Sequence, residues 1–209
     1  MIRLILLGAG GHARVVLELL RAAGGFEVLG LVDSRGGGGF VGGVPILGGE
    51  DTLPRLRAEG IAAAMVAIGD NAARERLGDV LLALAFGLPS AVHPAALVAP
   101  SARLGPGAVI MARAVLGTDT AVAALGLVNT GAILDHDGVL RRAAHLAPGS
   151  TLAGGVRVGA RALVGVGASV APGIGIGADA VVGAGAAVVE DVPEGARVGG
   201  VPARPLPVS

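Results

Sequence analysis

The sequence places one histidine between two carboxylates, at Asp135-His136-Asp137. A carboxylate beside an imidazole fixes the orientation of the ring and raises its basicity, which a general base at neutral pH requires. The region around this cluster otherwise carries few acidic residues, so the pattern favours chemistry over a solvated polar corner. We therefore predict that His136 is a catalytic base that takes a proton from a nucleophile, and that Asp137 orients the ring.

Other polar side chains lie close in sequence. Arg141 and Arg142 separate His136 from a second histidine, His145. The two arginines suit the phosphate groups of a cofactor, and they fit a pair of solvated charges equally well. Asn129 fits a side-chain ladder and a bond to substrate equally.

A glycine turn lies near the start of the chain. Gly8-x-Gly10-x-x-Ala13 separates an apolar run from an amphipathic stretch, and Asp33 ends the next apolar run. The acid lies about 20 residues after the turn, which matches the GxGxxA form of the dinucleotide fingerprint, in which backbone N–H groups hold a diphosphate and the acid bonds a ribose hydroxyl. His12 suits a phosphate or a sugar hydroxyl. A tight turn without a ligand is the alternative, and a solvated residue is the alternative for His12.

The element that must position His136 is a repeat of six residues. Every sixth residue from Val92 to Val188 is a branched aliphatic, 17 positions without interruption. A helix repeats its apolar face every 3.6 residues and a strand every 2, whereas a period of six is typical of a parallel β-helix. Three hexads make one triangular coil, and successive coils stack about 4.8 Å apart through parallel hydrogen bonds.

Small residues and glycines keep the same period. A small residue stands four places after most of the aliphatics. Glycine stands directly after six of them, where we expect a backbone conformation that a Cβ would oppose. These glycines are Gly105, Gly117, Gly159, Gly165, Gly177 and Gly183.

His145 follows His136 by half a coil. Half a turn puts the two side chains on different faces of one subunit. If both belong to one site, the site lies at a subunit interface, most simply in a three-fold trimer.

The first 90 residues alternate between strand and helix patterns, which predicts a parallel sheet with helices on its faces. The expected strands are 3–7, 27–32 and 62–68, and the expected helices are 13–23, 51–59 and 72–86. About 90 residues suffice for one mononucleotide-binding half, so a nucleoside diphosphate is favoured over a dinucleotide. We predict a Rossmann-like domain over 1–90, a β-helix over 91–191 and a capping or substrate-covering loop over 192–209. The hexads are expected to fail after Val188, since the next position is Glu194, and His93 at the junction is interpreted as structural.

Composition excludes several classes. The chain has no cysteine, so disulfides and thiolate metal sites are excluded, and a net charge of zero gives no argument for nucleic acid. The longest charge-free run, 162–178, is interrupted by glycines and Pro172, which argues against a membrane span. The start of the chain is already strand-like, with no signal peptide pattern, and we expect a cytoplasmic protein.

Several stretches together carry a resemblance to a known family. They are the turn at 8–13, Val32-Asp33, 68–71, the hexads, 129–137 and Gly200-Val201-Pro202-Ala203. In combination they resemble the sugar O/N-acyltransferases of the left-handed β-helix superfamily. The most similar group is the sialic acid O-acetyltransferase family, with its UDP-4-amino-sugar and GDP-perosamine N-acetyltransferases. The resemblance, and not the periodicity, implies the left hand.

The resemblance also implies a homotrimer that binds acetyl-CoA between neighbouring subunits and uses no metal. It implies that His136 is the general base and Asp137 the acid beside it, although that acid is often glutamate in the amino-sugar enzymes. The implied cofactor contacts are His145, Gly154, Val166 and Ala184. The implied nucleotide-sugar contacts are Gly10, Gly11, His12, Asp33 and Gly69. The loop 34–40 is nearly all glycine and departs from the family, so the sequence does not identify the nucleotide.

The function implied is direct transfer of an acetyl group from acetyl-CoA to the amine of a nucleotide-linked amino sugar of the UDP-4-amino-sugar type. O-acetylation of a sugar or sialic acid hydroxyl is one alternative. A non-catalytic nucleotide-sugar-binding scaffold is another, against which the Asp-His-Asp cluster argues. A nicotinamide-dependent enzyme is disfavoured by the short N-terminal domain.

Overall fold

The computed structural model describes residues 1–206, which form two compact units, Met1–Ala91 and a second that begins at Val92. The first unit is a five-stranded sheet in the order β3-β4-β2-β1-β5. Its strands are β1 (Ile2–Leu7), β2 (Phe26–Val32), β3 (Phe40–Val41), β4 (Val44–Gly48) and β5 (Ala63–Val66). Its helices are α1 (Gly11–Ala23), the 3-10 turn η1 (Glu50–Thr52), α2 (Leu53–Ala58) and α3 (Asn71–Ala83).

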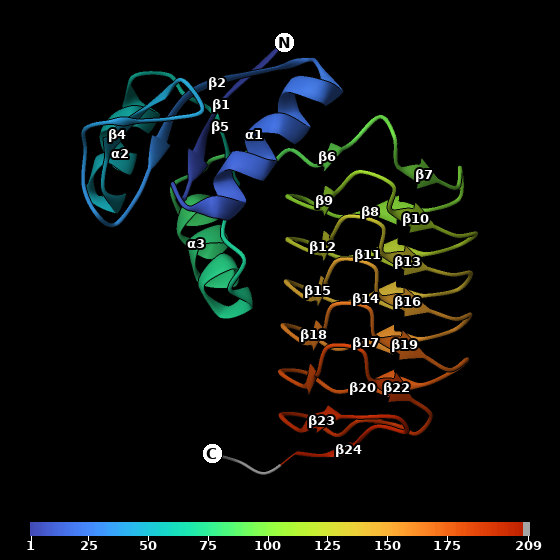
Figure 1. The fold of residues 1–209 in the computed structure, drawn as a ribbon. Coiled ribbons are helices and arrows are strands. Elements are labelled where there is room, and N and C mark those ends of the chain that lie inside the picture. The colour runs from blue at the N-terminus through green and yellow to red at the C-terminus, as the bar shows by residue number, and fades with distance from the viewer. Residues whose placement is uncertain (207–209) are drawn as a thin grey trace. The chain divides into compact units, whose positions relative to one another are not determined.

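β1 lies at the centre of the parallel part of this sheet, paired with β2 and β5 (Figure 1). Its last four residues are all buried, as expected for a strand covered on both faces. The predicted parallel sheet is therefore present. One further feature was not predicted. β3 pairs antiparallel with β4 through Gly42 and Gly43, whose φ values of 56° and 80° suit a tight two-residue hairpin.

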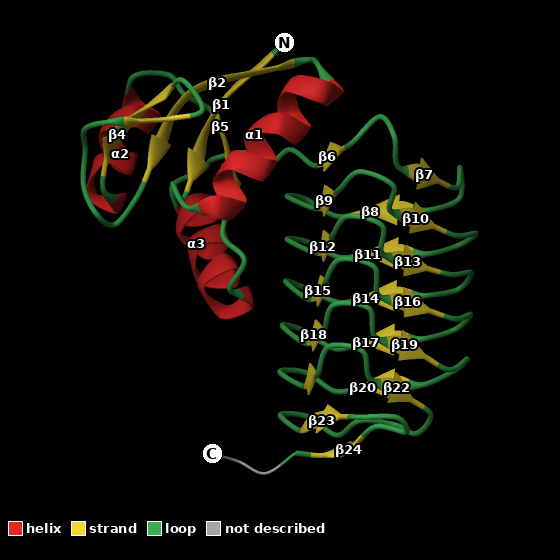
Figure 2. Cartoon of the chain, in the orientation of Figure 1, coloured by secondary structure: helices red, strands yellow, loops and turns green. Residues whose placement is uncertain are grey.

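The second unit is a three-sided stack of very short strands (Figure 2). A six-stranded sheet contains β7 (Leu97–Val98), β10 (Val115–Leu116), β13 (Ile133–Leu134), β16 (Thr151–Leu152), β19 (Ser169–Val170) and β22 (Ala187–Val188). A five-stranded sheet contains β8 (Arg103–Leu104), β11 (Ala121–Val122), β14 (Val139–Leu140), β17 (Arg157–Val158) and β20 (Gly175–Ile176). An eight-stranded sheet contains β6 (Ala91–Val92), β9 (Val109–Ile110), β12 (Leu127–Val128), β15 (His145–Leu146), β18 (Leu163–Val164), β21 (Val181–Val182), β23 (Arg197–Gly199) and β24 (Arg204–Pro205).

Strand pairing confirms the coil of three hexads, because Val115 pairs with Ile133, Ala121 with Val139 and Leu127 with His145. The hexad aliphatics form the core. Val92, Val98 and Leu104 at its start are half-buried, and every later position of the series through Val188 is buried. Each inward side chain therefore stacks on its counterpart one coil away.

The spacing of six residues is interrupted after Val188, as predicted, and Glu194 is exposed, but the coil itself does not end there. Ile176 pairs with Val192 and Val182 with Val198, so the coil continues, although its last turn is shorter than three hexads. Val192 and Val198 are both buried. The corner after Val188 is two residues shorter, and a count in steps of six therefore falls on Glu194 and misses the continuation. β24 then pairs antiparallel with β23, so part of the segment expected as a loop is strand.

The explanation given for the glycines after the aliphatics is wrong. None of the six has a φ in the left-handed region. Instead, a Cβ at Gly117 would lie 2.8 Å from the backbone nitrogen of His136, and at Gly159 and Gly177 it would collide with the backbone of the next coil. These glycines allow close stacking of coils. The left-handed residues stand two places later, at Gly107, Gly167 and Gly185 for example.

No helix of residues 1–206 is long and apolar enough to cross a membrane.

Candidate active site

His136 lies in the turn that follows β13. Its Nδ1 is 2.9 Å from Oδ2 of Asp137, and its backbone N–H donates to Oδ1 of Asp135 at 2.8 Å. A carboxylate can only accept, so Nδ1 carries the hydrogen in this pair, and Nε2 of the neutral ring holds the free lone pair. The predicted pairing of His136 with Asp137 is therefore present in the structure.

Both neighbouring acids raise the pKa of His136 above its ordinary value. The hydrogen bond that His136 donates to Asp137 is the larger cause, and the charge of Asp135 adds to it. A more basic imidazole is a stronger proton acceptor, and it requires a somewhat higher pH to be neutral.

The turn that holds this pair is fixed by its neighbours. Asp137 has a φ of 57°, in the left-handed region that aspartate tolerates better than most residues. Its N–H donates to the carbonyl of Thr118 one coil before, and the carbonyl of His136 accepts from Gly155 one coil after. The imidazole and its carboxylate are thus held by backbone hydrogen bonds on both sides.

Gly154 stands one coil after His136, directly beside the imidazole. A Cβ on Gly154 would overlap Cε1 and Nε2 of the ring and would lie 2.9 Å from Cδ2. The ring therefore occupies the space that any side chain at 154 would fill. Within residues 1–206 the N–H of Gly154 makes no hydrogen bond. We predicted Gly154 only as a cofactor contact, and its contact with His136 was missed, although a count of one coil from His136 would have found it.

His145 lies in β15 of the eight-stranded sheet. Its Nε2 is 3.1 Å from Nδ2 of Asn129, whose Oδ1 accepts from the N–H of Thr130 at 2.8 Å. The amide oxygen is therefore engaged, and Nδ2 donates to Nε2, which leaves the hydrogen of neutral His145 on Nδ1. Asn129, which the sequence left open, orients His145.

The predicted cofactor contacts fall on two different corners of the coil. The His136 corner follows the strands of the six-stranded sheet and carries Thr118, His136, Gly154 and Pro172. The Val166 corner follows the strands of the eight-stranded sheet and carries Val166 and Ala184, which are exposed and joined through the hydrogen bond from Gly185 N–H to the Val166 carbonyl. His145 belongs to the sheet that leads into the Val166 corner. One chain therefore presents the predicted residues as two separate sets.

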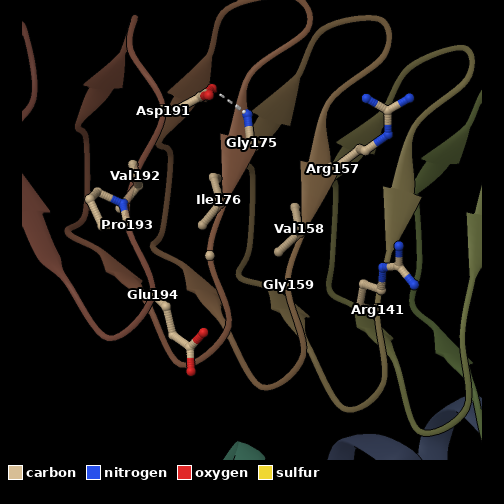
Figure 3. A pocket seen from close by; sticks show the side chains of 11 residues that line it. Arg141, Arg157, Val158, Gly159, Gly175, Ile176, Asp191, Val192, Pro193 and Glu194 are labelled. Carbon is tan, nitrogen blue, oxygen red and sulfur yellow. Dashed lines mark hydrogen bonds between the residues drawn. The ribbon is translucent and has the colours of Figure 1, made fainter.

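Arg141 lines an open groove of about 450 Å³ on the five-stranded side of the β-helix (Figure 3). Arg157 lines it as well, and neither guanidinium forms an ion pair within the described part of the chain. Asp191 lines it too and accepts from the N–H of Gly175 at 2.7 Å. The phosphate role considered for Arg141 stays a prediction.

In the N-terminal unit the glycine turn, Asp33 and Gly69 meet at the carboxyl ends of β1, β2 and β5. They line a cavity of about 370 Å³, in the position where open α/β sheets bind ligands. A Cβ on Gly10 or Gly69 would project into open space, so the fold itself does not demand glycine at these places. Gly8 is different, since its φ is 109° and a Cβ would lie 2.9 Å from the carbonyl oxygen of Ala67. Gly10 and Gly69 leave room for a ligand to approach the backbone.

Asp33 connects the turn to the second strand. Its Oδ2 accepts from the N–H of Ala9 at 2.8 Å, and its Oδ1 accepts from Nε of Arg35 at 2.6 Å. The hydrogen bond from Arg35 is the main reason that the pKa of Asp33 is lowered to about 2. The carboxylate is therefore charged at neutral pH and holds the shape of the turn.

His12 lines the same cavity, and Arg74 is hydrogen-bonded to the backbone of two other lining residues. Burial, and then the charge of Arg74, lowers the pKa of His12 to about 4, so the ring is neutral near pH 7. Arg74 is 2% exposed and donates to the carbonyls of Ile68 and Gly69 at 3.1 Å. Sequence reasoning missed Arg74, because an arginine within a helix pattern is usually exposed. A buried positive charge here favours an anionic ligand.

Comparisons with known proteins agree with this fold. Residues 3–81 match the PglD N-terminal domain. The chain is 36% identical over 112 residues, 51% of this chain and 50% of the relative, to UDP-N-acetylbacillosamine N-acetyltransferase of Bacillus subtilis (strain 168). That match therefore spans half of the relative.

Solved structures match over nearly the whole chain. PerB from Caulobacter crescentus, in complex with CoA and GDP-perosamine, superimposes with a TM-score of 0.94 at 47% identity over 98% of this chain and 97% of that one. The acetyltransferase domain of PglB from Neisseria gonorrhoeae FA1090, in complex with acetyl coenzyme A, gives 0.93 at 39% identity over 98% and 99%.

A hexad β-helix with an acid-supported imidazole, preceded by a nucleotide-type α/β unit, defines a hexapeptide-repeat acyltransferase. The chain belongs to the sugar O/N-acyltransferase family of left-handed β-helix proteins, together with the sugar N-acetyltransferases described above. The expected fold class is confirmed, and the expectation of acetyl-CoA agrees with the complexes of these relatives.

Proposed function

We propose that this protein transfers an acetyl group from acetyl-CoA to the amine of a nucleotide-linked amino sugar, with His136 as the general base. The observation that carries the proposal is the arrangement of His136. Asp137 holds Nδ1, and within residues 1–206 neither Nε2 nor the N–H of the adjacent Gly154 makes a hydrogen bond. The relatives act on nucleotide sugars of both the UDP and the GDP type, so the UDP type expected from the sequence stays a prediction.

In this reaction Nε2 accepts a proton from the amine as its nitrogen attacks the thioester carbon. The carbonyl oxygen of the thioester becomes an oxyanion, and the N–H of Gly154 is available to stabilise it, a contribution worth about 3 kcal/mol in other enzymes. Collapse of the intermediate breaks the C–S bond, and the imidazolium returns its proton to the leaving thiolate. Asp137 stabilises the imidazolium in the meantime.

We place the acetyl-CoA site between subunits of a homotrimer. Support comes from the two separate corners, because a second subunit would be needed to add His145, Val166 and Ala184 to the site of His136. We assign the nucleotide to the cavity of the N-terminal unit, whose contacts would be Gly10, Gly11, His12, Asp33 and Gly69. A cytoplasmic location stays a prediction.

A subunit-mixing experiment tests this assignment. We expect His136→Ala and His145→Ala each to be nearly inactive alone. Their equal mixture should recover about a quarter of wild-type turnover. In randomly assembled trimers, about a quarter of the interfaces combine an intact His136 from one subunit with an intact His145 from its neighbour. Thiol release from acetyl-CoA with GDP- and UDP-linked amino sugars measures it. A mixed oligomer that stays as inactive as either variant would argue that both histidines act from one subunit.

The pH dependence gives a second test. Because protonated imidazole cannot accept a proton, kcat/KM falls as pH drops below the pKa of His136, and the raised pKa makes this fall begin above the ordinary histidine range. Asp137→Asn removes the charge and tolerates the left-handed φ. We expect its pH profile to shift to lower pH and its maximal rate to decrease.

Asp119→Asn is the matched control, since Asp119 stands one coil earlier with a φ of 58°. Its profile should coincide with the wild type. An unshifted profile for Asp137→Asn would show that Asp137 does not tune the base.

A further inference from the structure

A second, smaller cavity in the N-terminal unit encloses about 200 Å³. Gly8, Asp33, Ser34 and Ile68 line both this cavity and the one assigned above to the nucleotide. The two spaces therefore adjoin along the carboxyl ends of β1, β2 and β5. A ligand with its phosphates at the glycine turn has this cavity as the nearest recess for another part of the molecule.

Most of the wall is apolar. Leu7 of β1, Val32 of β2 and Leu77 of α3 face the space, and each is nearly fully buried. A small recess with aliphatic walls suits a flat heteroaromatic ring, because both of its faces can be desolvated against hydrocarbon. The size and the aliphatic faces suit a nucleobase better than a sugar, whose hydroxyl groups on both faces of the ring would meet hydrocarbon.

One part of the wall carries a matched pair of charges. Nη1 and Nη2 of Arg76 each donate to one carboxylate oxygen of Glu50 at 2.9 Å. The side chains are 57% and 35% exposed, and an ion pair so exposed contributes little to stability. A fork of donors beside two acceptors, at the wall of an apolar recess, is the arrangement that reads the edge of a base.

We propose that Glu50 and Arg76 select the base of the nucleotide and that the base is guanine; this inference rests on the nucleotide-sugar function proposed above. Guanine presents two adjacent donors, N1–H and N2–H₂, to the two oxygens of a carboxylate. Its O6 acceptor stands beside them for the guanidinium. Uracil offers one N–H, and adenine offers one amino group next to an acceptor, so neither can donate to both oxygens of Glu50 at once.

Titration calorimetry of GDP, UDP and ADP against the full-length protein, without acetyl-CoA, tests the inference. The wild type should bind GDP about 10- to 100-fold more tightly than UDP or ADP, the range expected for one bidentate contact. Glu50→Gln should lose most of this preference by weakening GDP alone. Glu59→Gln, which breaks the exposed Arg55–Glu59 pair of the same unit, should keep it.

Three outcomes would overturn the inference. They are a wild type that binds UDP or ADP as tightly as GDP, a Glu50→Gln protein that keeps the full preference, and a Glu59→Gln protein that loses it equally. Arg76→Lys provides a second variant if Glu50→Gln unfolds, and it should also reduce the preference. Failure of the wild type to bind any of the three nucleotides would refute the proposed nucleotide-sugar function itself.

Discussion

Replacing His136 with alanine is expected to lower kcat by about 10²- to 10⁴-fold, the usual contribution of a general base. The amine of an amino sugar is protonated or weakly nucleophilic until a base removes its proton. The two carboxylates beside His136 are far weaker bases than an imidazole. Thr118, Gly154 and Pro172, the nearest residues of the His136 corner, carry no group that accepts a proton at neutral pH. Only a weak base or water is left as the acceptor in the variant.

Thiol release from acetyl-CoA at saturating substrate measures this loss. The imidazole is 60% exposed in the single chain and makes no core contact, so folding and assembly should be unchanged by circular dichroism and light scattering. Thr118→Ala, one coil earlier on the same corner, is the control and should retain wild-type turnover. Turnover within a factor of three of the wild type for His136→Ala would remove His136 as the base.

The β-helix was predictable because its core residues recur at a fixed spacing of six along the sequence. One column of the core contains Leu134, Leu152 and Val170, each one coil from the next. Such a period can be recognised in the sequence without knowing the conformation of the turns. The end of the repeat was not predictable in the same way. A corner shortened by two residues before Val192 moves the phase, and nothing local to Glu194 shows that the coil goes on.

In the candidate site, too, features local in sequence were predictable, and contacts between distant residues were not. His136 and Asp137 were found because they are adjacent in sequence and their chemistry is unusual for a solvated turn. The contact of Asn129 with His145 links residues 16 apart, and only the register of β12 with β15 brings them together. Arg74 was missed for a related reason, since its burial depends on how α3 packs and its own neighbours do not predict it.

The cavity at the carboxyl ends of β1, β2 and β5, which we propose for the nucleotide, was only partly predictable. The glycine turn and Asp33 belong to a known fingerprint, so their meeting could be expected. The link between Glu50 and Arg76 spans 26 residues and depends on η1 and α3 ending up at one wall. The nearly featureless loop at 34–40 gave no indication of a base, and the charged pair that we propose for this role comes from outside that loop.

Gly154→Ala is expected to lower kcat by about 10²-fold, the usual effect of displacing a catalytic group by about 1 Å. The added methyl would overlap Cε1 and Nε2 of His136, so the ring must turn away from its position. Rotation of the ring also breaks the geometry of the 2.9 Å bond to Asp137, which lowers the basicity of Nε2. The backbone at position 154 can accommodate alanine, because the φ of Gly154 is not in the left-handed region. Other corners carry alanine at the matching position, namely Ala124, Ala160 and Ala184.

Crystallography of Gly154→Ala should therefore show an unchanged coil with a displaced imidazole, and thermal unfolding should shift little. Pro172→Ala, one coil further on the same corner, places an alanine against no imidazole and should keep wild-type kcat. If the added methyl acts by displacing the imidazole, the losses in kcat of the two substitutions are not additive. Gly154→Ala should then cause no further loss of kcat in a His136→Ala background. A full additional loss in that background would mean that position 154 acts on acetyl-CoA independently of the base.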